Sequence, residues 1–150
     1  MRPHKLQKDS KNKILLHLKK KTDNSYAIRI EAGILSKIPD YIKELKLNGK
    51  FIIITDSNVL PLYGEKLYNS LINKGFSGNI ISFEAGEKNK TRKTKERLED
   101  YMLKNSFGRD SFIIAIGGGV TGDIAGFIAA TYNRGIPFIQ VPTTLLSMVD

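Results

Sequence analysis

The 150-residue sequence contains no cysteine, no tryptophan and only two histidines, His4 and His17. Without cysteine, a disulfide framework and a thiolate metal site such as a zinc finger are both excluded. No apolar run approaches the ~20 residues that a membrane-spanning helix needs, and the amino terminus lacks the apolar core of a secretory signal. We therefore expect a cytoplasmic protein without a membrane partner.

Basic side chains outnumber acidic ones, 24 to 15, but the excess is concentrated at the amino terminus. Residues 1–21 hold eight Lys or Arg and one Asp, so residues 22–150 keep sixteen basic and fourteen acidic side chains, a net charge of only +2. This balance argues against a folded nucleic-acid-binding face. We expect residues 1–24 to form a basic, mobile leader and residues 25–150 to form one domain. An organelle-targeting or nucleic-acid-binding arm is the alternative interpretation of the leader.

Apolar segments with strand character alternate with stretches of helical period from residue 26 onward. We predict strands at residues 26–30, 51–54, 80–83, 111–116 and 137–141, and helices at about 35–48, 61–74, 91–105 and 121–132. Leu45 and Ile72 are expected on the inward faces of the first two helices. The alternation predicts a Rossmann-like α/β fold, an open, mostly parallel sheet with helices on both faces. In such a sheet, ligands bind beyond the carboxyl ends of the strands.

A glycine-rich segment lies between a predicted buried strand and a predicted helix. It reads Gly117-Gly118-Gly119-Val120-Thr121-Gly122-Asp123. It satisfies the G-x-G-x-x-G pattern in the context where that pattern binds a pyrophosphate through backbone N–H groups and the helix dipole. We expect the glycines to supply backbone angles that other residues avoid and a close approach to the ligand. A purely structural tight turn is the alternative.

The ordinary dinucleotide fingerprint also requires an acidic residue about twenty positions further on, to hold a ribose hydroxyl. That window contains Ile139, Gln140 and Val141 instead. Asp56, at the end of an earlier strand, is the available replacement, and a strand-end cap is the alternative role for its carboxylate.

Five further segments of the sequence are distinctive. They are T-D-S-N-V (55–59), G-E-K-N-K (86–90), I-G-G-G-V-T-G-D-I-A-G-F (116–127), T-Y-N-R-G (131–135) and F-I-Q-V-P-T-T-L-L-S-M-V-D (138–150). Together they resemble the 3-dehydroquinate synthases, and the resemblance covers the chain from about Tyr26 to its end. Val120 and the Ile124–Phe127 segment resemble this family more than the polyol and iron-dependent alcohol dehydrogenases of the same architecture.

The resemblance implies an NAD site built from several loops and two residues that reach the substrate. Asp150 would contact the substrate where the ring forms, and Arg134 would bind a substrate phosphate across the interface of a homodimer. The implied NAD contacts are Asp56, Asn58, Gly86, Glu87, Lys88, Lys90, Gly118, Gly119, Val120, Thr121, Gly122, Asp123, Thr143 and Thr144.

The resemblance also implies a reaction. Family members are phosphate-eliminating lyases of the shikimate pathway that convert 3-deoxy-D-arabino-heptulosonate 7-phosphate to 3-dehydroquinate, toward chorismate and the aromatic amino acids. They use NAD transiently and a divalent metal, zinc or cobalt, held by one Glu and two His in a helical second domain. We expect that domain to be absent here, His4 and His17 to bind no metal, and this chain alone to bind NAD without catalysis. Alternatives are a sugar-phosphate cyclase of the inosose or valiolone type and a stand-alone dinucleotide-binding module.

Overall fold

The structure is a computed structural model that describes residues 6–8, 14–16 and 25–149. The chain divides into two compact units, Met1–Glu31 and Ala32–Asp150. In the first unit, β1 (Leu6–Lys8) pairs antiparallel with β2 (Ile14–Leu16). The remainder of the predicted leader, with His4 and His17, lies outside the described residues.

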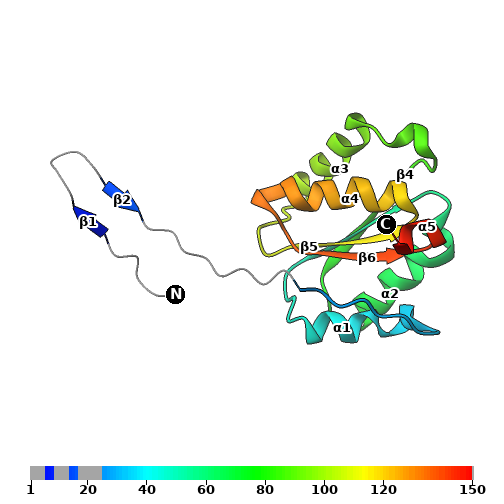
Figure 1. Cartoon of the computed structure of the whole chain (residues 1–150). Helices are drawn as coiled ribbons and strands as arrows, with labels where there is room; N and C mark the ends of the chain where they lie inside the picture. Colours follow the sequence, from blue (N-terminus) through cyan, green and yellow to red (C-terminus); the bar gives the residue numbers. More distant parts are fainter. Residues whose placement is uncertain (1–5, 9–13, 17–24, 150) are drawn as a thin grey trace. The chain divides into compact units, whose positions relative to one another are not determined.

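The second unit is built on a four-stranded parallel sheet, as the alternation of strands and helices predicts (Figure 1). Its strand order is β4-β3-β5-β6, so the chain runs outward from β3 to one edge, returns to β5 and continues to the other edge. The order reverses between β3 and β5, and ligands of open α/β sheets bind beside such a switch point. The strands are β3 (Phe51–Asp56), β4 (Gly78–Phe83), β5 (Phe112–Gly117) and β6 (Phe138–Pro142).

Helices cover both faces of this sheet (Figure 1). One face carries α1 (Ile38–Glu44) and α2 (Glu65–Asn73), which are preceded by the short turns η1 (Ile34–Lys37) and η2 (Leu60–Gly64). The other face carries α3 (Arg92–Lys104) and α4 (Gly119–Thr131). The remaining short elements are η3 (Glu87–Asn89), η4 (Tyr132–Arg134) and α5 (Leu145–Val149). Among the residues that the structure describes, none of the helices has the length and apolar character that crossing a bilayer requires.

The two central strands supply both halves of the core because successive side chains of a strand point to opposite faces. Ile52 and Ile54 of β3 pack with Leu98 of α3 and Ile128 of α4. Phe51 and Ile53 pack on the other face, in a cluster that also contains Ile38, Ile42, Leu67, Leu71, Phe112, Ile114 and Ile116. The uninterrupted apolar character of these strands therefore reflects burial on both faces.

The strand predicted at residues 26–30 is wrong. Among the described residues, none of the ladders includes this segment, and Tyr26, Ile28 and Ile30 are 84%, 74% and 92% exposed. Alternation gives a segment the right side chains for a strand, but a strand also needs a hydrogen-bonded neighbour. Leu45 and Ile72 are exposed rather than inward-facing, and α1 ends at Glu44, before the predicted stop at Asn48 and Gly49.

Candidate functional site

The glycine turn joins the carboxyl end of β5 to the first turn of α4. Gly117 is the last residue of β5, and Gly118 precedes α4 in an extended conformation, with φ −82° and ψ −168°. No side chain among the described residues caps the first amides of α4 at Gly118. The first backbone N–H groups of a helix have no partner within the helix, and they carry the positive end of its dipole. The turn can therefore donate several N–H groups to an anion.

The glycines are required by close packing and not by unusual backbone angles. The described glycines with positive φ are Gly33, Gly75, Gly86 and Gly135, so the angle argument is wrong for the turn. A Cβ added at Gly117 would overlap the Thr121 side chain, whereas one at Gly118 would lie 3.2 Å from Thr144 Cγ2. At Gly122 it would lie 3.3 Å from Gln140 Nε2. Three neighbouring side chains thus occupy the space that a larger residue would need.

Asp56 lies half-buried at the end of β3, beside the glycine turn. Its Oδ1 accepts the backbone N–H groups of Asn58 at 2.9 Å and Val59 at 3.0 Å. Its Oδ2 accepts the hydroxyl of Thr121 at 3.2 Å, and Thr121 is 1% exposed. The carboxylate therefore ties the loop after β3 to the first turn of α4, which is the capping role weighed as its alternative.

The loop after β4 is brought to α4 by one ion pair. Lys90 Nζ lies 2.5 Å from Asp123 Oδ2 and 3.9 Å from Glu87 Oε1. Gly86 turns the loop with φ +114°, and the Ala85 amide donates to Ser57 Oγ at 3.1 Å. Glu87, Lys88 and Lys90 are exposed on this loop. Two of the predicted cofactor segments, residues 86–90 and 118–123, therefore meet in the folded unit.

The loop after β6 completes the edge. The Thr143 amide donates to Gly117 O at 2.9 Å, which fixes this loop against the glycine turn. The Thr144 hydroxyl lies 2.9 Å from Ser147 Oγ and accepts the Ser147 amide at 3.3 Å, so it caps the first turn of α5. Thr143 and Thr144 thus lie beside Gly117 and Gly118.

Of the two predicted substrate residues, the structure describes Arg134, which does not lie at this edge. Arg134 follows the carboxyl end of α4, whereas the glycine turn precedes its amino end. Thirteen helical residues separate these ends, a length of about 20 Å at 1.5 Å per residue. Asn133, Arg134 and Gly135 all have positive φ (50°, 71° and 101°), a conformation that two of these residues rarely adopt. Asp150 lies outside the described residues.

Sequence reasoning overlooked three polar residues that shape the site. Ser57 Oγ holds the loop after β4, and Gln140 Nε2 donates to Ser147 O at 3.2 Å. Ser147 also exchanges hydrogen bonds with Thr144. The spacing of Thr144 and Ser147, three residues apart at a helix start, is a capping signal that could have revealed this pair.

Among the described residues, no cluster of metal-ligand side chains marks this edge. A depression of about 300 Å³ lies near the opposite, amino-terminal edge of the sheet, where Lys43, Lys50 and Lys74 contribute to its lining. Within residues 6–8, 14–16 and 25–149, no three His, Cys, Asp or Glu side chains gather where a metal ion could bind. The candidate site is therefore defined by the converging strand ends and the amides of the glycine turn.

Comparisons with known proteins indicate one family. The model described as the 3-dehydroquinate synthase N-terminal domain matches residues 80–150. The 3-dehydroquinate synthase of Desulforamulus reducens is 48% identical over 128 residues, 85% of this chain and 36% of that protein. The enzyme of Caldanaerobacter subterraneus subsp. tengcongensis is 46% identical over 139 residues, 93% of this chain and 38% of that protein. The chain thus spans little more than a third of the relatives it matches.

Solved structures of sugar-phosphate cyclases share the fold. A 2-epi-5-epi-valiolone synthase from Streptomyces hygroscopicus subsp. jinggangensis, with NAD+ and Zn2+ bound, superposes with a TM-score of 0.74 at 28% identity, over 89% of this chain and 37% of that one. A 2-deoxy-scyllo-inosose synthase complexed with carbaglucose-6-phosphate, NAD+ and Co2+ gives 0.64 at 31% identity, over 77% and 31% of the two chains.

Proposed function

Because this chain belongs to the 3-dehydroquinate synthase family and matches the amino-terminal part of its members, we propose that its α/β unit is the NAD-binding part of such an enzyme. The observation that carries the proposal is the start of α4, where a glycine turn presents helix amides at the switch point of a parallel sheet. The negative charge of an NAD pyrophosphate suits these amide donors, and the glycines allow the backbone to approach it closely.

Residues around the turn would hold the cofactor. Amides of Gly118, Gly119 and Val120 would bind the pyrophosphate, while Thr143 and Thr144 would border it from the loop after β6. The Gly122 amide already donates to Gly118 O at 3.1 Å, so Gly122 would contribute close packing and not a free N–H group. Thr121 would act indirectly, since its buried hydroxyl holds Asp56. Asp123 and the loop of Gly86, Glu87, Lys88 and Lys90 would close one side of the site, where the Lys90–Asp123 ion pair already joins the two segments.

We further propose that the complete reaction is that of 3-dehydroquinate synthase, which forms 3-dehydroquinate and phosphate from 3-deoxy-D-arabino-heptulosonate 7-phosphate. The NAD held by this unit would supply reversible hydride transfer for that reaction. The described residues offer no ligand cluster for a metal such as the Zn2+ or Co2+ bound in the structural neighbours. The residues of this chain would bind and orient the cofactor.

Arg134 would serve a second copy of the chain. It lies at the end of α4 remote from the glycine turn, so within one unit it is badly placed to share a substrate with the cofactor. Its guanidinium suits a phosphate, and three successive positive φ angles hold the backbone at this point. We propose that Arg134 binds the substrate phosphate in the partner of a homodimer. Asp150 would contact the substrate on its own side.

A cyclase of the inosose or valiolone type is the second candidate. The structural neighbours of these types share the fold at 28–31% identity. Relatives named 3-dehydroquinate synthase are 45–48% identical over about 85% of the chain or more, and this higher identity favours the first candidate. Both candidates require the same cofactor site.

The experiment that tests the proposed cofactor is a calorimetric titration of the 150-residue chain with NAD and with NADP. NAD should bind about tenfold more tightly, because the Asp56 carboxylate beside the ribose would repel a 2'-phosphate. Asp56→Asn should reduce this preference while its amide oxygen still accepts the two loop N–H groups. Asp110→Asn, an exposed charge removed elsewhere, should keep the preference of the parent. Tighter binding of NADP by the parent would refute the role of Asp56, and failure to bind either dinucleotide would refute the proposed function.

A further inference from the structure

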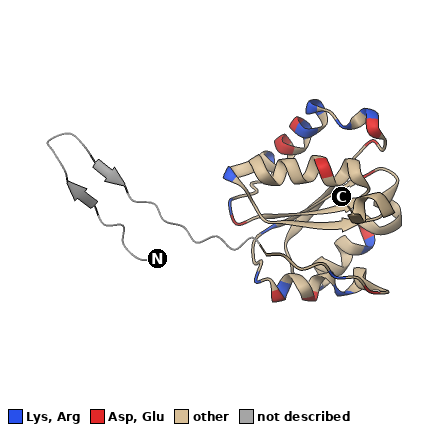
Figure 2. Ribbon diagram, in the orientation of Figure 1, with Lys and Arg blue, Asp and Glu red and all other residues tan. Residues whose placement is uncertain are grey.

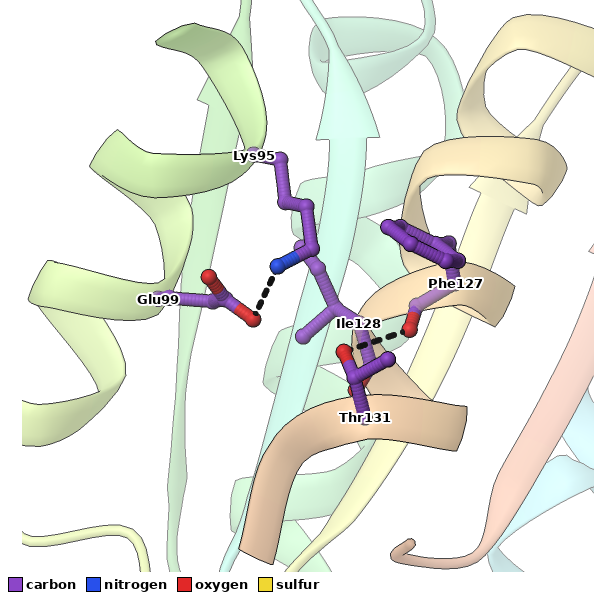
Figure 3. Close-up of polar contacts among 5 residues, drawn as sticks. All are labelled: Lys95, Glu99, Phe127, Ile128 and Thr131. Atoms are coloured by element: carbon purple, nitrogen blue, oxygen red, sulfur yellow. Dashed lines mark hydrogen bonds and ion pairs between the residues drawn. The ribbon is translucent and has the colours of Figure 1, made fainter. Parts of the chain in front are cut away.

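Lys95 of α3 lies between α3 and α4, in the seam where these two helices pack side by side on one face of the sheet (Figure 3). Its Nζ forms an ion pair with Glu99 Oε1 at 2.6 Å, one turn further along α3. The same Nζ lies 5.2 Å from the centroid of the Phe127 ring on α4. Lys95 therefore connects the two helices through a cation–π contact that Glu99 holds in place.

The Lys95–Glu99 ion pair is less exposed than a typical surface ion pair. The side chains of Lys95 and Glu99 are only 22% and 24% exposed, so solvent screens their charges less than usual. On α4, the Phe127 carbonyl accepts the Thr131 hydroxyl at 2.9 Å, and Ile128 beside it is fully buried in the core (Figure 3). The backbone of α4 is therefore fixed at this point, whereas the Phe127 ring itself is 58% exposed and meets Lys95 at the outer rim of the seam.

The same seam carries the Lys90–Asp123 ion pair at its end nearer the glycine turn. Lys90 precedes Lys95 by five residues, and Asp123 precedes Phe127 by four, which is about one helical turn. Between the two contacts, Thr91 caps α3 by accepting the Thr94 amide at 3.2 Å. The first turn of α3 is therefore held on α4 at both ends, by Lys90 before it and Lys95 within it.

We propose that Lys95 is a positioning residue for the dinucleotide site: it locks the first turn of α3 to α4 and so holds the Gly86–Lys90 loop against Asp123. The inference rests on the proposed NAD site, and it adds a residue one turn outside that site. Without the Lys95 contact, the first turn of α3 loses its contact with Phe127 of α4. The loop before it then depends more on the Lys90–Asp123 ion pair and on the Ala85–Ser57 hydrogen bond.

The first experiment needs no cofactor and measures hydrogen exchange of the Gly86–Thr91 amides. Lys95→Met keeps the length of the side chain and removes its charge, whereas Lys95→Arg keeps the charge and the contact with the ring. Lys93→Met, which removes an exposed charge from the same helix, is the matched control. Exchange should accelerate about threefold or more in Lys95→Met alone. Equal exchange in Lys95→Met and the parent would overturn the proposal.

The second experiment asks whether the effect passes through Lys90. Lys95→Met should weaken NAD binding about three- to tenfold, with Lys95→Arg and Lys93→Met close to the parent. In a Lys90→Met background, Lys95→Met should weaken binding no further, because the contact it positions is already gone. An undiminished effect in that background, or a loss of thermal stability without any change in affinity, would overturn the positioning role. If the parent binds no NAD, the proposed function fails, while the exchange measurement still decides whether Lys95 orders the loop.

Discussion

Asp56 shows how much a single side chain at a strand end can organise. Its carboxylate accepts two backbone amides from its own loop and the hydroxyl of Thr121 from α4. The sequence predicted an acidic residue at the edge where the cofactor should bind, because a strand end and a missing ribose acid both indicated that position. The hydrogen bond to Thr121 joins residues 65 positions apart, and no local pattern predicts such a pairing.

Tyr132 provides a prediction for alkaline pH. Burial, and secondarily the negative charge of Glu99, raise the pKa of its hydroxyl above the ordinary value of 10.0. A pKa raised on folding stabilises the folded state below pH 10, and this stabilisation is lost as the pH rises through the ordinary value and beyond. The free energy of unfolding should therefore fall above pH 10, partly through this residue.

The test compares the parent with Tyr132→Phe in denaturant titrations from pH 8 to pH 11. The hydroxyl donates to Phe107 O at 2.9 Å, so its removal should cost about 1 kcal/mol at pH 8. That difference should shrink above pH 10. There the hydroxyl ionises more readily in the unfolded parent than in the folded parent, which lowers the parent's free energy of unfolding, whereas the variant has no hydroxyl to ionise. Tyr63→Phe, at a largely exposed tyrosine, serves as the control. A Tyr132→Phe difference that stays constant across this range would contradict the account.

At the scale of elements, the glycine pattern in the sequence located the turn between β5 and α4 correctly. The expected reason for the glycines, unusual backbone angles, was wrong. Glycines were expected to provide left-handed backbone angles, and the structure instead shows side chains from elsewhere filling the space beside them. Thr144 and Gln140, which crowd Gly118 and Gly122, come from the loop and strand after α4. Such crowding depends on tertiary packing, which periodicity in a single sequence does not reveal.

Glycine-to-alanine substitutions along this segment should have opposite effects on stability. Gly117→Ala would place a methyl group on the buried Thr121 side chain and should lower the free energy of unfolding by about 1–3 kcal/mol. At Gly126, in the middle of α4, an added Cβ would lie at an ordinary 3.7 Å from the Phe138 ring. Gly126→Ala should therefore stabilise the unit by about 0.5–1 kcal/mol through helix propensity. Denaturant unfolding of both variants is the measurement, and equal stability of Gly117→Ala and the parent would refute the packing argument.

Strands were predicted well where they are central and less well at the margins. The buried strands at residues 51–56 and 112–117 show continuous apolar runs, which require burial on both faces. The segment at 26–30 has the alternation of a strand without a ladder in the described residues. Sequence pattern reports which side chains a strand would tolerate, whereas pairing depends on which edges the fold leaves available.

For the molecule as a whole, charge distribution follows the sequence closely. Figure 2 shows Lys, Arg, Asp and Glu spread along the outer helices α1 to α3, as the near-balance of residues 22–150 predicts. The elements β6 and α5 contain no charged residue, and Leu145, Leu146 and Val149 of α5 are each more than 70% exposed. Exposed apolar side chains of α5 therefore lie directly after the loop of Thr143 and Thr144, which borders the candidate cofactor site.

The central claim is that NAD binds at the carboxyl edge of the sheet, on the amides that precede and begin α4. Its most direct test is a titration of the isotope-labelled 150-residue chain with NAD, followed by backbone amide chemical shifts. The account predicts saturable shifts that are largest for Gly118 to Gly122 and extend to Asp56–Val59, Gly86–Lys90 and Thr143–Thr144. Largest shifts around Lys43, Lys50 and Lys74 at the opposite edge, or no saturable shifts at all, would contradict it.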